Sequence, residues 1–154
     1  MLSQNKAEIP ETILAYVAGV FDGEGSVSVS KAPPNKSHGR KNPHFNLLVA
    51  ITNCNAEMLL FAQKLFGGNF HARKNIRLGA NHVCYAWQLN CWQAHRFLSA
   101  IYPYLIAKKR VAELGIQYQE NIAIPWDRHK GLAVEEVAKR QWYHDEIKRY
   151  NAMD

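Results

Sequence analysis

The chain has 154 residues, of which 47% are hydrophobic and 11% aromatic, and it carries 19 Lys and Arg against 13 Asp and Glu. This length and composition predict one globular domain with a buried core, and they exclude a disordered, collagen-like or repetitive chain. No uncharged apolar run approaches the roughly 20 residues that a membrane-spanning helix needs. We therefore expect a soluble, intracellular protein without a membrane partner.

The positive charge is concentrated in the middle of the chain. Between Glu24 and Glu113 the only acidic residue is Glu57, whereas twelve Lys and Arg and five His share that stretch. Residues 25–112 therefore carry +11 and the rest of the chain −5, which adds up to the net +6. Such a block favours a polyanionic partner, nucleic acid before a membrane surface, because no basic amphipathic helix or lipidation signal accompanies it. The alternative is a basic but inert surface.

The first half of the chain predicts a helix, two strands and a second helix. Apolar residues recur at helical spacing from Glu11 to about Asp22, before the sequence Asp-Gly-Glu-Gly. Apolar and polar residues then alternate over 26–30 and 45–51, which predicts two strands joined by a basic loop at 32–43. Asn55 is a good N-cap for the next helix, which Gly67 and Gly68 end.

The second half repeats this order and adds helices. Strands are predicted over 69–74 and 82–90, and helices over 94–101, about 105–122 and about 132–150. The order αββαββα predicts an α+β domain over residues 10–124, with one four-stranded antiparallel sheet and helices on a single face. We expect residues 125–154 to pack on the same domain as a helical extension.

The three cysteines predict neither a disulfide framework nor a zinc site. Cys54, Cys84 and Cys91 are odd in number and form no Cys-x-x-Cys pair. We expect them to be buried or half-buried thiols.

Strand periodicity divides the predicted sheet into an apolar face toward the helices and an uncovered polar face. Polar and basic side chains on that face and in the loops at its rim are of the kinds that contact bases and phosphates. For a single strand, ordinary solvated residues would explain them better. Across four strands we favour a nucleic-acid interface, with these candidates: Ser28, Ser30, Lys31, Lys36, Arg40, Lys41, His44, Asn46, Asn69, His71, Arg73, Lys74, Arg77, His82, Gln88 and Lys109.

The end of the first helix carries two carboxylates where negative charge is unfavourable. Asp22 and Glu24 follow a stripe of small residues made by Ala15, Ala18 and Gly19, which would let another backbone approach closely. A carboxylate at a helix C-terminus costs about 0.3–1 kcal/mol. A divalent cation such as Mg²⁺, which prefers oxygen ligands, would offset that cost. The alternative is an acidic turn that leads into a strand.

Three features of the sequence resemble the LAGLIDADG homing endonucleases. Val17-Ala18-Gly19-Val20-Phe21-Asp22-Gly23-Glu24-Gly25 stands where their signature would, and the order of elements matches over about residues 10–120. The segment Tyr102-Pro103-Tyr104-Leu105-Ile106-Ala107-Lys108-Lys109 resembles the family's Pro-x-Leu-x-x-Lys segment. Only one copy of the signature is present, and single-motif members act as homodimers.

The resemblance implies roles for individual residues. Glu24 matches the metal-binding acid, the Gly23 carbonyl the backbone metal ligand beside it, and Asp22 the first acid of the motif, which shapes the helix end. Lys108 matches the basic residue that assists activation of water or steadies phosphate charge, and an ordinary surface lysine is the alternative. Asn53 would order water in the active site and is the fourth implied catalytic residue. Glu57 stands near a position that is basic in some relatives. The implied dimer interface consists of Ala15, Ala18, Gly19 and Asp22.

The implied function is sequence-specific hydrolysis of double-stranded DNA at a long, pseudo-palindromic target, with one active site in each subunit of a homodimer. The implied cofactor is Mg²⁺, with Mn²⁺ able to substitute and Ca²⁺ binding without efficient cleavage. Intron homing would be the biological setting. The alternatives are an RNA-binding intron maturase on the same scaffold and a DNA-binding regulator.

Overall fold

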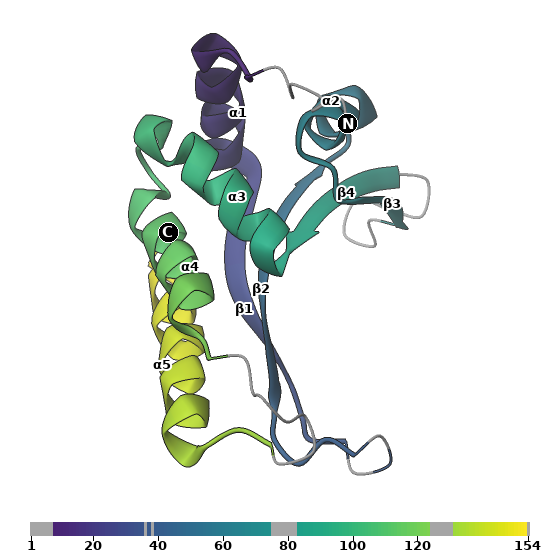
Figure 1. Cartoon of the computed structure of the whole chain (residues 1–154). Helices are drawn as coiled ribbons and strands as arrows, with labels where there is room; N and C mark the ends of the chain where they lie inside the picture. The colour runs from purple at the N-terminus through teal and green to yellow at the C-terminus, as the bar shows by residue number, and fades with distance from the viewer. Residues whose placement is uncertain (1–7, 36, 38, 75–82, 124–130, 154) are drawn as a thin grey trace, which may run out of the picture.

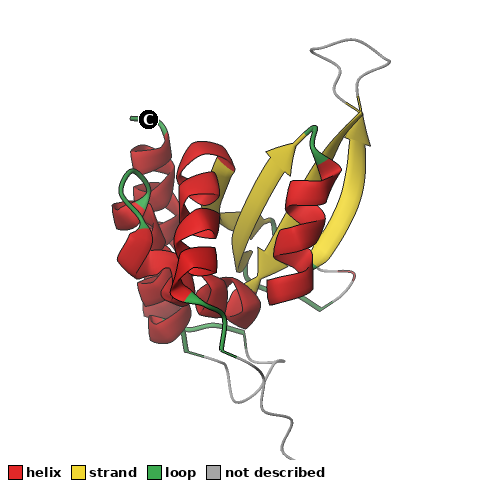
Figure 2. Cartoon of the chain, turned by 90° about the horizontal axis from the view of Figure 1, so that it is seen from above, coloured by secondary structure: helices red, strands yellow, loops and turns green. Residues whose placement is uncertain are grey.

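One antiparallel sheet organises the chain, and the computed structural model describes residues 8–35, 37, 39–74, 83–123 and 131–153 (Figure 1). The strands lie in the order β1-β2-β4-β3. Figure 2 shows the helices gathered on one side of the strands. The predicted α+β class and αββαββα order are therefore confirmed. The elements are β1 (Gly25–Ala32), β2 (His44–Asn53), β3 (Asn69–Lys74), β4 (Val83–Asn90), α1 (Glu11–Glu24), α2 (Ala56–Phe66), α3 (Cys91–Ile101), the short 3-10 helix η3 (Tyr102–Tyr104), α4 (Lys109–Asn121) and α5 (Val134–Asn151).

The sheet register separates a covered face from an open face. Val27 pairs with Val49, which pairs with Leu89, and all three side chains are fully buried beneath the helices. The alternate positions point to the other face, as Ser28 and its partner Leu48 do. The predicted outward residues that share this open face are Ser28, Ser30, His44, Asn46, Asn69, His71, Arg73 and Gln88.

Two helix boundaries differ from the predicted ones. Helix α1 continues through Gly23 to Glu24, so both acids belong to its last turn. Helix α4 begins at Lys109 rather than near Leu105, because Pro103 lies in η3 and Leu105 has an extended backbone. The segment from Leu105 to Lys108 is therefore a connection, and it runs past the end of α1.

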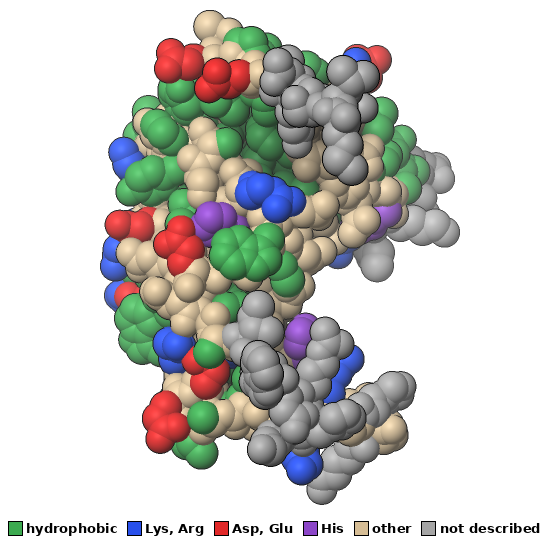
Figure 3. Space-filling model, in the orientation of Figure 1, with side chains coloured by type: hydrophobic (Ala, Val, Ile, Leu, Met, Phe, Trp, Pro, Cys, Tyr) green, Lys and Arg blue, Asp and Glu red, His purple; other side chains and the backbone are tan. Residues whose placement is uncertain are grey.

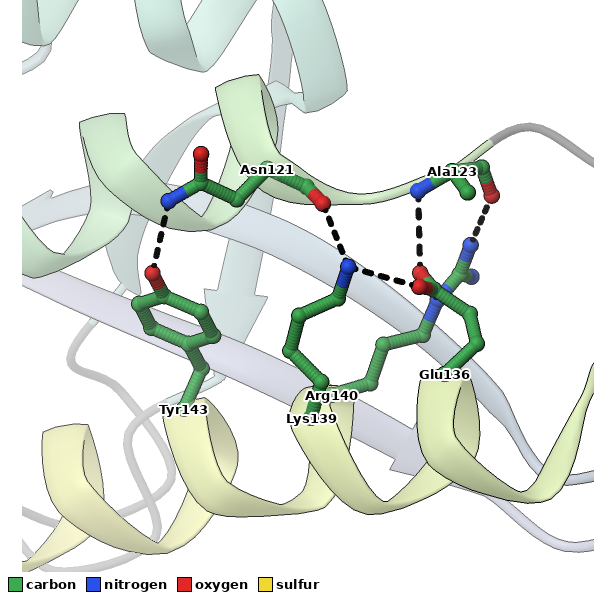
Figure 4. A network of polar contacts seen from close by, with 6 residues as sticks. All are labelled: Asn121, Ala123, Glu136, Lys139, Arg140 and Tyr143. Atoms are coloured by element: carbon green, nitrogen blue, oxygen red, sulfur yellow. Dashed lines mark hydrogen bonds and ion pairs between the residues drawn. The ribbon is translucent and has the colours of Figure 1, made fainter.

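A polar network fixes the start of α5 against the end of α4 (Figure 4). The Glu136 carboxylate accepts hydrogen bonds from the Ala123 N–H at 2.9 Å and from Arg140 Nε at 3.0 Å, and Lys139 Nζ lies 2.7 Å from it. Lys139 and Arg140 also donate to the carbonyls of Asn121 and Ala123, both at 2.7 Å. The C-terminal extension therefore packs on the same body as the sheet.

The cysteines depart from expectation. Cys54 and Cys84 are joined in a disulfide, and Cys91 is exposed. The pairing follows from the register, because Asn53 pairs with Tyr85 and the two cysteines continue that antiparallel ladder by one step. Spacing along the chain carries no trace of it, since the cysteines are 30 residues apart.

The open face is hollowed, and Figure 3 shows Lys, Arg and His side chains around the hollow. Strands β1 and β2 run beside α5 to the lower end of the molecule (Figure 1). Within the described residues, no helix is both long and apolar enough to cross a membrane.

Candidate nucleic-acid interface

The junction between α1 and β1 is tight because the chain passes directly from helix to strand. The Phe21 ring is fully buried and lies against the Cα of Gly25, where a Cβ would overlap it. Glycine is therefore required at residue 25 by packing within one chain. The contact fixes the last turn of α1, with Asp22, Gly23 and Glu24, at the edge of the sheet.

Asp22 holds the connection that precedes α4. Its two carboxylate oxygens accept hydrogen bonds from the backbone N–H groups of Ile106 at 2.8 Å and Lys108 at 2.9 Å. These partners lie 84 and 86 residues along the chain. Both oxygens of the carboxylate are therefore engaged in the fold, which agrees with a role in shaping the helix end.

Lys108 reaches the same helix end from the other side. Its Nζ donates to the Asp22 carbonyl at 2.8 Å, which satisfies one of the free carbonyls at the C-terminus of α1. A cation at this end of a helix is also favoured by the macrodipole. Lys108 and the two N–H groups thus offset the unfavourable position of Asp22 without a metal, contrary to our expectation that a cation would be needed for both acids.

Glu24 has no such compensation. It is exposed, and its carboxylate makes no hydrogen bond or ion pair with any residue that the structure describes. Beside it, a Cβ at Gly23 would meet nothing within 4 Å, so the surface is open there. Since Mg²⁺ is commonly held by one or two carboxylates together with substrate phosphates, a free carboxylate beside the exposed Gly23 fits this ion. The described residues contain no group of three or more His, Cys, Asp or Glu that could enclose a metal by themselves.

Asn53 lies close to this edge in the sheet. The register pairs Gly25 with Ile51, so Asn53 follows two residues after the partner of Gly25. Its Oδ1 accepts from the Asn55 N–H at 2.8 Å, and Asn55 in turn caps α2 by accepting from the Met58 N–H at 3.2 Å. The Asn53 oxygen therefore shapes the turn into α2, and its Nδ2 remains available as a donor. Glu57 is exposed in the first turn of α2.

Asn46 occupies a fixed place on the open face. Its Nδ2 donates to Asn90 Oδ1 at 3.1 Å, and its Oδ1 accepts from the Cys91 thiol at 2.7 Å. Ser30 Oγ, from the neighbouring strand, donates to the Asn46 carbonyl at 3.2 Å. His71 and Arg73 of β3 and His44 at the start of β2 are exposed on the same face. These side chains form a polar surface across all four strands.

Other predicted contact residues lie elsewhere. Lys31 pairs with the buried Phe45 and lies two residues after Val29, so its side chain is on the covered side of the sheet. Its Nζ lies 5.8 Å from the centre of the Phe45 ring. Lys109 Nζ lies 5.2 Å from the centre of the Tyr102 ring, on the helical side. Arg40 and Lys41 are exposed in the loop before β2, and Lys74 ends β3. Lys36, Arg77 and His82 lie outside the described residues.

The outer surface of α1 differs from the predicted small-residue stripe in one position. Ala18 is fully buried in the core, so it cannot meet a second copy, and including it was wrong. Ala15 and Gly19 are exposed, and a Cβ at Gly19 would meet nothing within 4 Å. Next to them Tyr16 is 54% exposed and stands edge-on to the exposed Phe61 of α2, with ring centres 6.3 Å apart. The exposed stripe therefore consists of Ala15, Gly19 and Gly23 with an aromatic pair beside it.

Solved structures with this architecture identify the fold. The archaeal intron-encoded homing endonuclease I-Vdi141I in complex with DNA aligns over 91% of this chain and 84% of its own, with 18% identity and a TM-score of 0.71. The homing endonuclease I-CvuI with DNA aligns over 91% and 82%, with 16% identity and a TM-score of 0.70. The LAGLIDADG homing endonuclease I-LtrWI bound to target DNA aligns over 94% and 47%, with 14% identity and a TM-score of 0.66. The chain has the LAGLIDADG homing endonuclease fold.

The LAGLIDADG fold accounts for the arrangement that the sequence resemblance predicted. The signature forms the end of α1 and its junction with β1, and the predicted Pro-x-Leu-x-x-Lys segment forms the connection held by Asp22. Neither a scan against models of protein families nor a search of curated proteins gives a match. The exposed contact between Tyr16 and Phe61 was not expected from the sequence, in which the only signal was an aromatic residue in each helix.

Proposed function

We propose that this chain is a metal-dependent DNA endonuclease that acts as a homodimer on long, pseudo-palindromic double-stranded targets, and that its setting is intron homing. The observation that carries the proposal is the free Glu24 carboxylate at the end of α1, at the margin of an open polar face. The proposal is supported by the fold, which this chain shares with DNA-bound homing endonucleases. In a protein that only binds nucleic acid, an unpaired carboxylate close to the phosphates would weaken binding, so the position of Glu24 favours an enzyme.

In this proposal the residues of the α1 end divide the work. Glu24 and the Gly23 carbonyl would hold Mg²⁺, which supplies activation of water and stabilisation of the leaving oxygen in phosphodiester hydrolysis. Asp22 is a positioning residue, because its contacts are to the backbone of Ile106 and Lys108. Asn53 would order water through its remaining donor. If the Lys108 ammonium group leaves the Asp22 carbonyl when DNA binds, it would stabilise negative charge on the phosphate. If it stays there, its role would be to hold the end of α1.

The dimer would form along the exposed stripe of α1. Ala15, Gly19 and Gly23 let a second helix backbone approach closely, and Tyr16 with Phe61 supplies apolar surface beside it. A two-fold axis through this stripe would bring both Glu24 side chains together under one duplex. The two open faces would then form a continuous surface, with His44, Asn46 and the rim residues Arg40 and Lys41 toward the outer base pairs.

The decisive experiment selects duplexes from a randomised library by binding in Ca²⁺ and then transfers them to Mg²⁺ or Mn²⁺. We expect double-strand cleavage in Mg²⁺ and Mn²⁺ and bound but intact DNA in Ca²⁺. Of the I-CvuI complexes, one was determined with Ca, and another with Mg held DNA that was not cleaved, so solution assays are the appropriate readout. Selected duplexes that stay intact in all three ions would overturn the proposal, and selective binding of structured RNA would favour a maturase.

Glu24→Gln tests the metal acid. We expect the variant to lose at least about a thousandfold in cleavage rate, because it would no longer hold the metal that would activate water and stabilise the leaving oxygen. It should bind DNA without divalent metal as the parent does. The matched control is Glu135→Gln, an exposed acid in the first turn of α5. Retained cleavage by Glu24→Gln would show that the metal acid lies elsewhere.

A further inference from the structure

A pocket with a volume of about 540 Å³ lies beside the part of β2 that extends past β4. Pairing between the two strands ends at Leu48 and Asn90, so the edge of residues 44–47 has no strand on that side among the described residues. The start of α3, the last turn of α4 and Arg140 of α5 close the other sides. The volume is in the range of small-molecule sites, roughly 300–1,000 Å³.

The pocket is positively charged. Arg40, Lys41 and Arg140 line it, and none of the described residues that line it is acidic. Arg140 is 8% exposed and is paired with Glu136, which does not line the pocket and also pairs with Lys139, so two cations share one anion beside the pocket. The surplus charge favours an anionic ligand.

Gln119 supplies an unused polar group. It is 5% exposed and lines the pocket, and its Oε1 has no hydrogen-bond partner among the described residues. Within the described part of the chain its Nε2 has none either. Buried side-chain amides are normally hydrogen-bonded, so the Gln119 amide is a candidate partner for a polar ligand in the pocket. An amide presents a donor beside an acceptor, which matches the edge of a base that does the same, as adenine does.

The remaining walls are apolar and aromatic. Trp92 lines the pocket with its side chain 46% exposed, and Phe45, Ile122 and Leu132 contribute apolar surface. An exposed indole offers a face on which a planar base can stack. A base among these side chains, with its phosphate at Arg40 and Lys41 on the rim, satisfies the charge, the amide and the aromatic surface together.

We propose that this pocket binds one nucleoside monophosphate unit, with the base between Trp92 and Gln119 and the phosphate at Arg40 and Lys41. The unit is either a free mononucleotide or an unpaired nucleotide of a single strand. His44 and Asn46 belong both to the pocket and to the open face, so a strand that leaves the open face can enter here. The site is separate from the Glu24 edge and requires neither metal nor cleavage.

The test measures equilibrium binding in EDTA by titration calorimetry, which makes it independent of nuclease activity. The probes are AMP, CMP, adenosine, inorganic phosphate and a single-stranded adenine octanucleotide. We expect AMP or the octanucleotide to bind, AMP more tightly than CMP, and both adenosine and phosphate more weakly than AMP. Binding of AMP alone identifies a mononucleotide site, whereas binding of the octanucleotide alone identifies a strand.

Three variants assign the binding to this pocket. Trp92→Ala and Gln119→Leu should each weaken it about tenfold, through loss of stacking and of the amide contact. The control Trp142→Ala removes an indole with a similar exposure, 52%, outside the pocket and should stay within twofold. Gln119→Leu should also unfold at no lower urea concentration than the parent, since it removes an unsatisfied buried amide. No saturable binding by any nucleotide probe, or equal losses in Trp92→Ala and Trp142→Ala, would overturn the proposal.

Discussion

Asp22 and Glu24 lie two residues apart in the last turn of α1, but their surroundings differ completely. The Asp22 carboxylate accepts two backbone hydrogen bonds, and its carbonyl accepts a third bond from Lys108. The Glu24 carboxylate has no partner among the described residues and remains at the unfavourable end of the helix dipole. The first acid therefore stabilises the fold, whereas the second is available for chemistry.

Replacement of each acid by its amide should separate these roles in stability measurements. In Asp22→Asn the amide oxygen can still accept one of the two backbone hydrogen bonds, but the amide NH₂ then faces the other backbone N–H. We therefore expect this variant to have a free energy of unfolding about 1–2 kcal/mol lower than the parent. Glu24→Gln should leave that free energy unchanged or raise it by up to about 1 kcal/mol, because it removes a charge that the dipole disfavours. Urea unfolding without divalent metal measures both.

Divalent metal is left out of these unfolding measurements so that metal binding by Glu24 cannot contribute to the stability of the parent protein. A loss of stability in Glu24→Gln equal to that in Asp22→Asn would contradict the division of roles. It would indicate that Glu24 has a structural partner in solution.

The errors of the sequence analysis have two different physical reasons. Ala18 lies three residues before Phe21, on the buried side of α1. Lys31 lies on the same side of β1 as Val27 and Val29. Helix and strand periodicity could therefore have placed both residues correctly. The partners of Asp22 and the Cys54–Cys84 disulfide depend on tertiary contacts between distant segments, and neither can be read from spacing. Local pattern predicted the faces of the sheet and the end of α1, but it could not show which acid was already engaged.

Among the elements, α4 and α5 are joined by a polar network. Glu136 and Arg140 are each 8% exposed, and the carboxylate is shared by two cations and a backbone N–H. Burial opposes ionisation of Glu136, but hydrogen bonds from Lys139, Arg140 and Ala123 hold its pKa below the ordinary value of 4.5. The carboxylate is therefore charged in the folded state at neutral pH.

This network predicts an acid-sensitive contribution to stability. A folded pKa below the unfolded one stabilises the fold fully above about pH 4.5, and the contribution is lost as the pH falls through the folded pKa. At pH 7 we expect Glu136→Gln to lower the free energy of unfolding by about 3 kcal/mol, since two cations lose their buried partner. The difference from the parent should shrink as the pH falls toward 3. Urea unfolding of both proteins across this range measures it.

The comparison with the parent isolates Glu136 from other acids. Arg149 lowers the pKa of Glu146 through a hydrogen bond, but that pair is present in both proteins and cancels. Glu135→Gln, on the adjacent exposed residue, should change stability by less than about 0.5 kcal/mol. A difference between parent and Glu136→Gln that stays constant down to pH 3 would contradict the assignment.

At the scale of the whole molecule, the glycines of α1 are explained only in part by one chain. Gly25 is required because the Phe21 ring lies against it, but a Cβ at Gly19 or Gly23 would meet nothing within 4 Å. Glycine inside a helix costs about 0.5–1 kcal/mol relative to alanine. Among the described residues nothing offsets that cost at Gly19, whereas a second helix packed against it in the proposed dimer would.

Gly19→Leu should therefore act in opposite directions on the monomer and the dimer. In the isolated chain the substitution should raise the free energy of unfolding by about 0.5–1 kcal/mol, because leucine is the better helix former and has room. In the proposed dimer the side chain would separate the two helices, so the sedimenting mass should fall from twice 17.6 kDa to 17.6 kDa. The control Ala138→Leu adds a leucine to the exposed face of α5 and should leave the mass unchanged. A Gly19→Leu protein that remains dimeric would contradict close packing of the two α1 helices at this stripe. A monomeric parent that cuts both strands would contradict the proposed dimer itself.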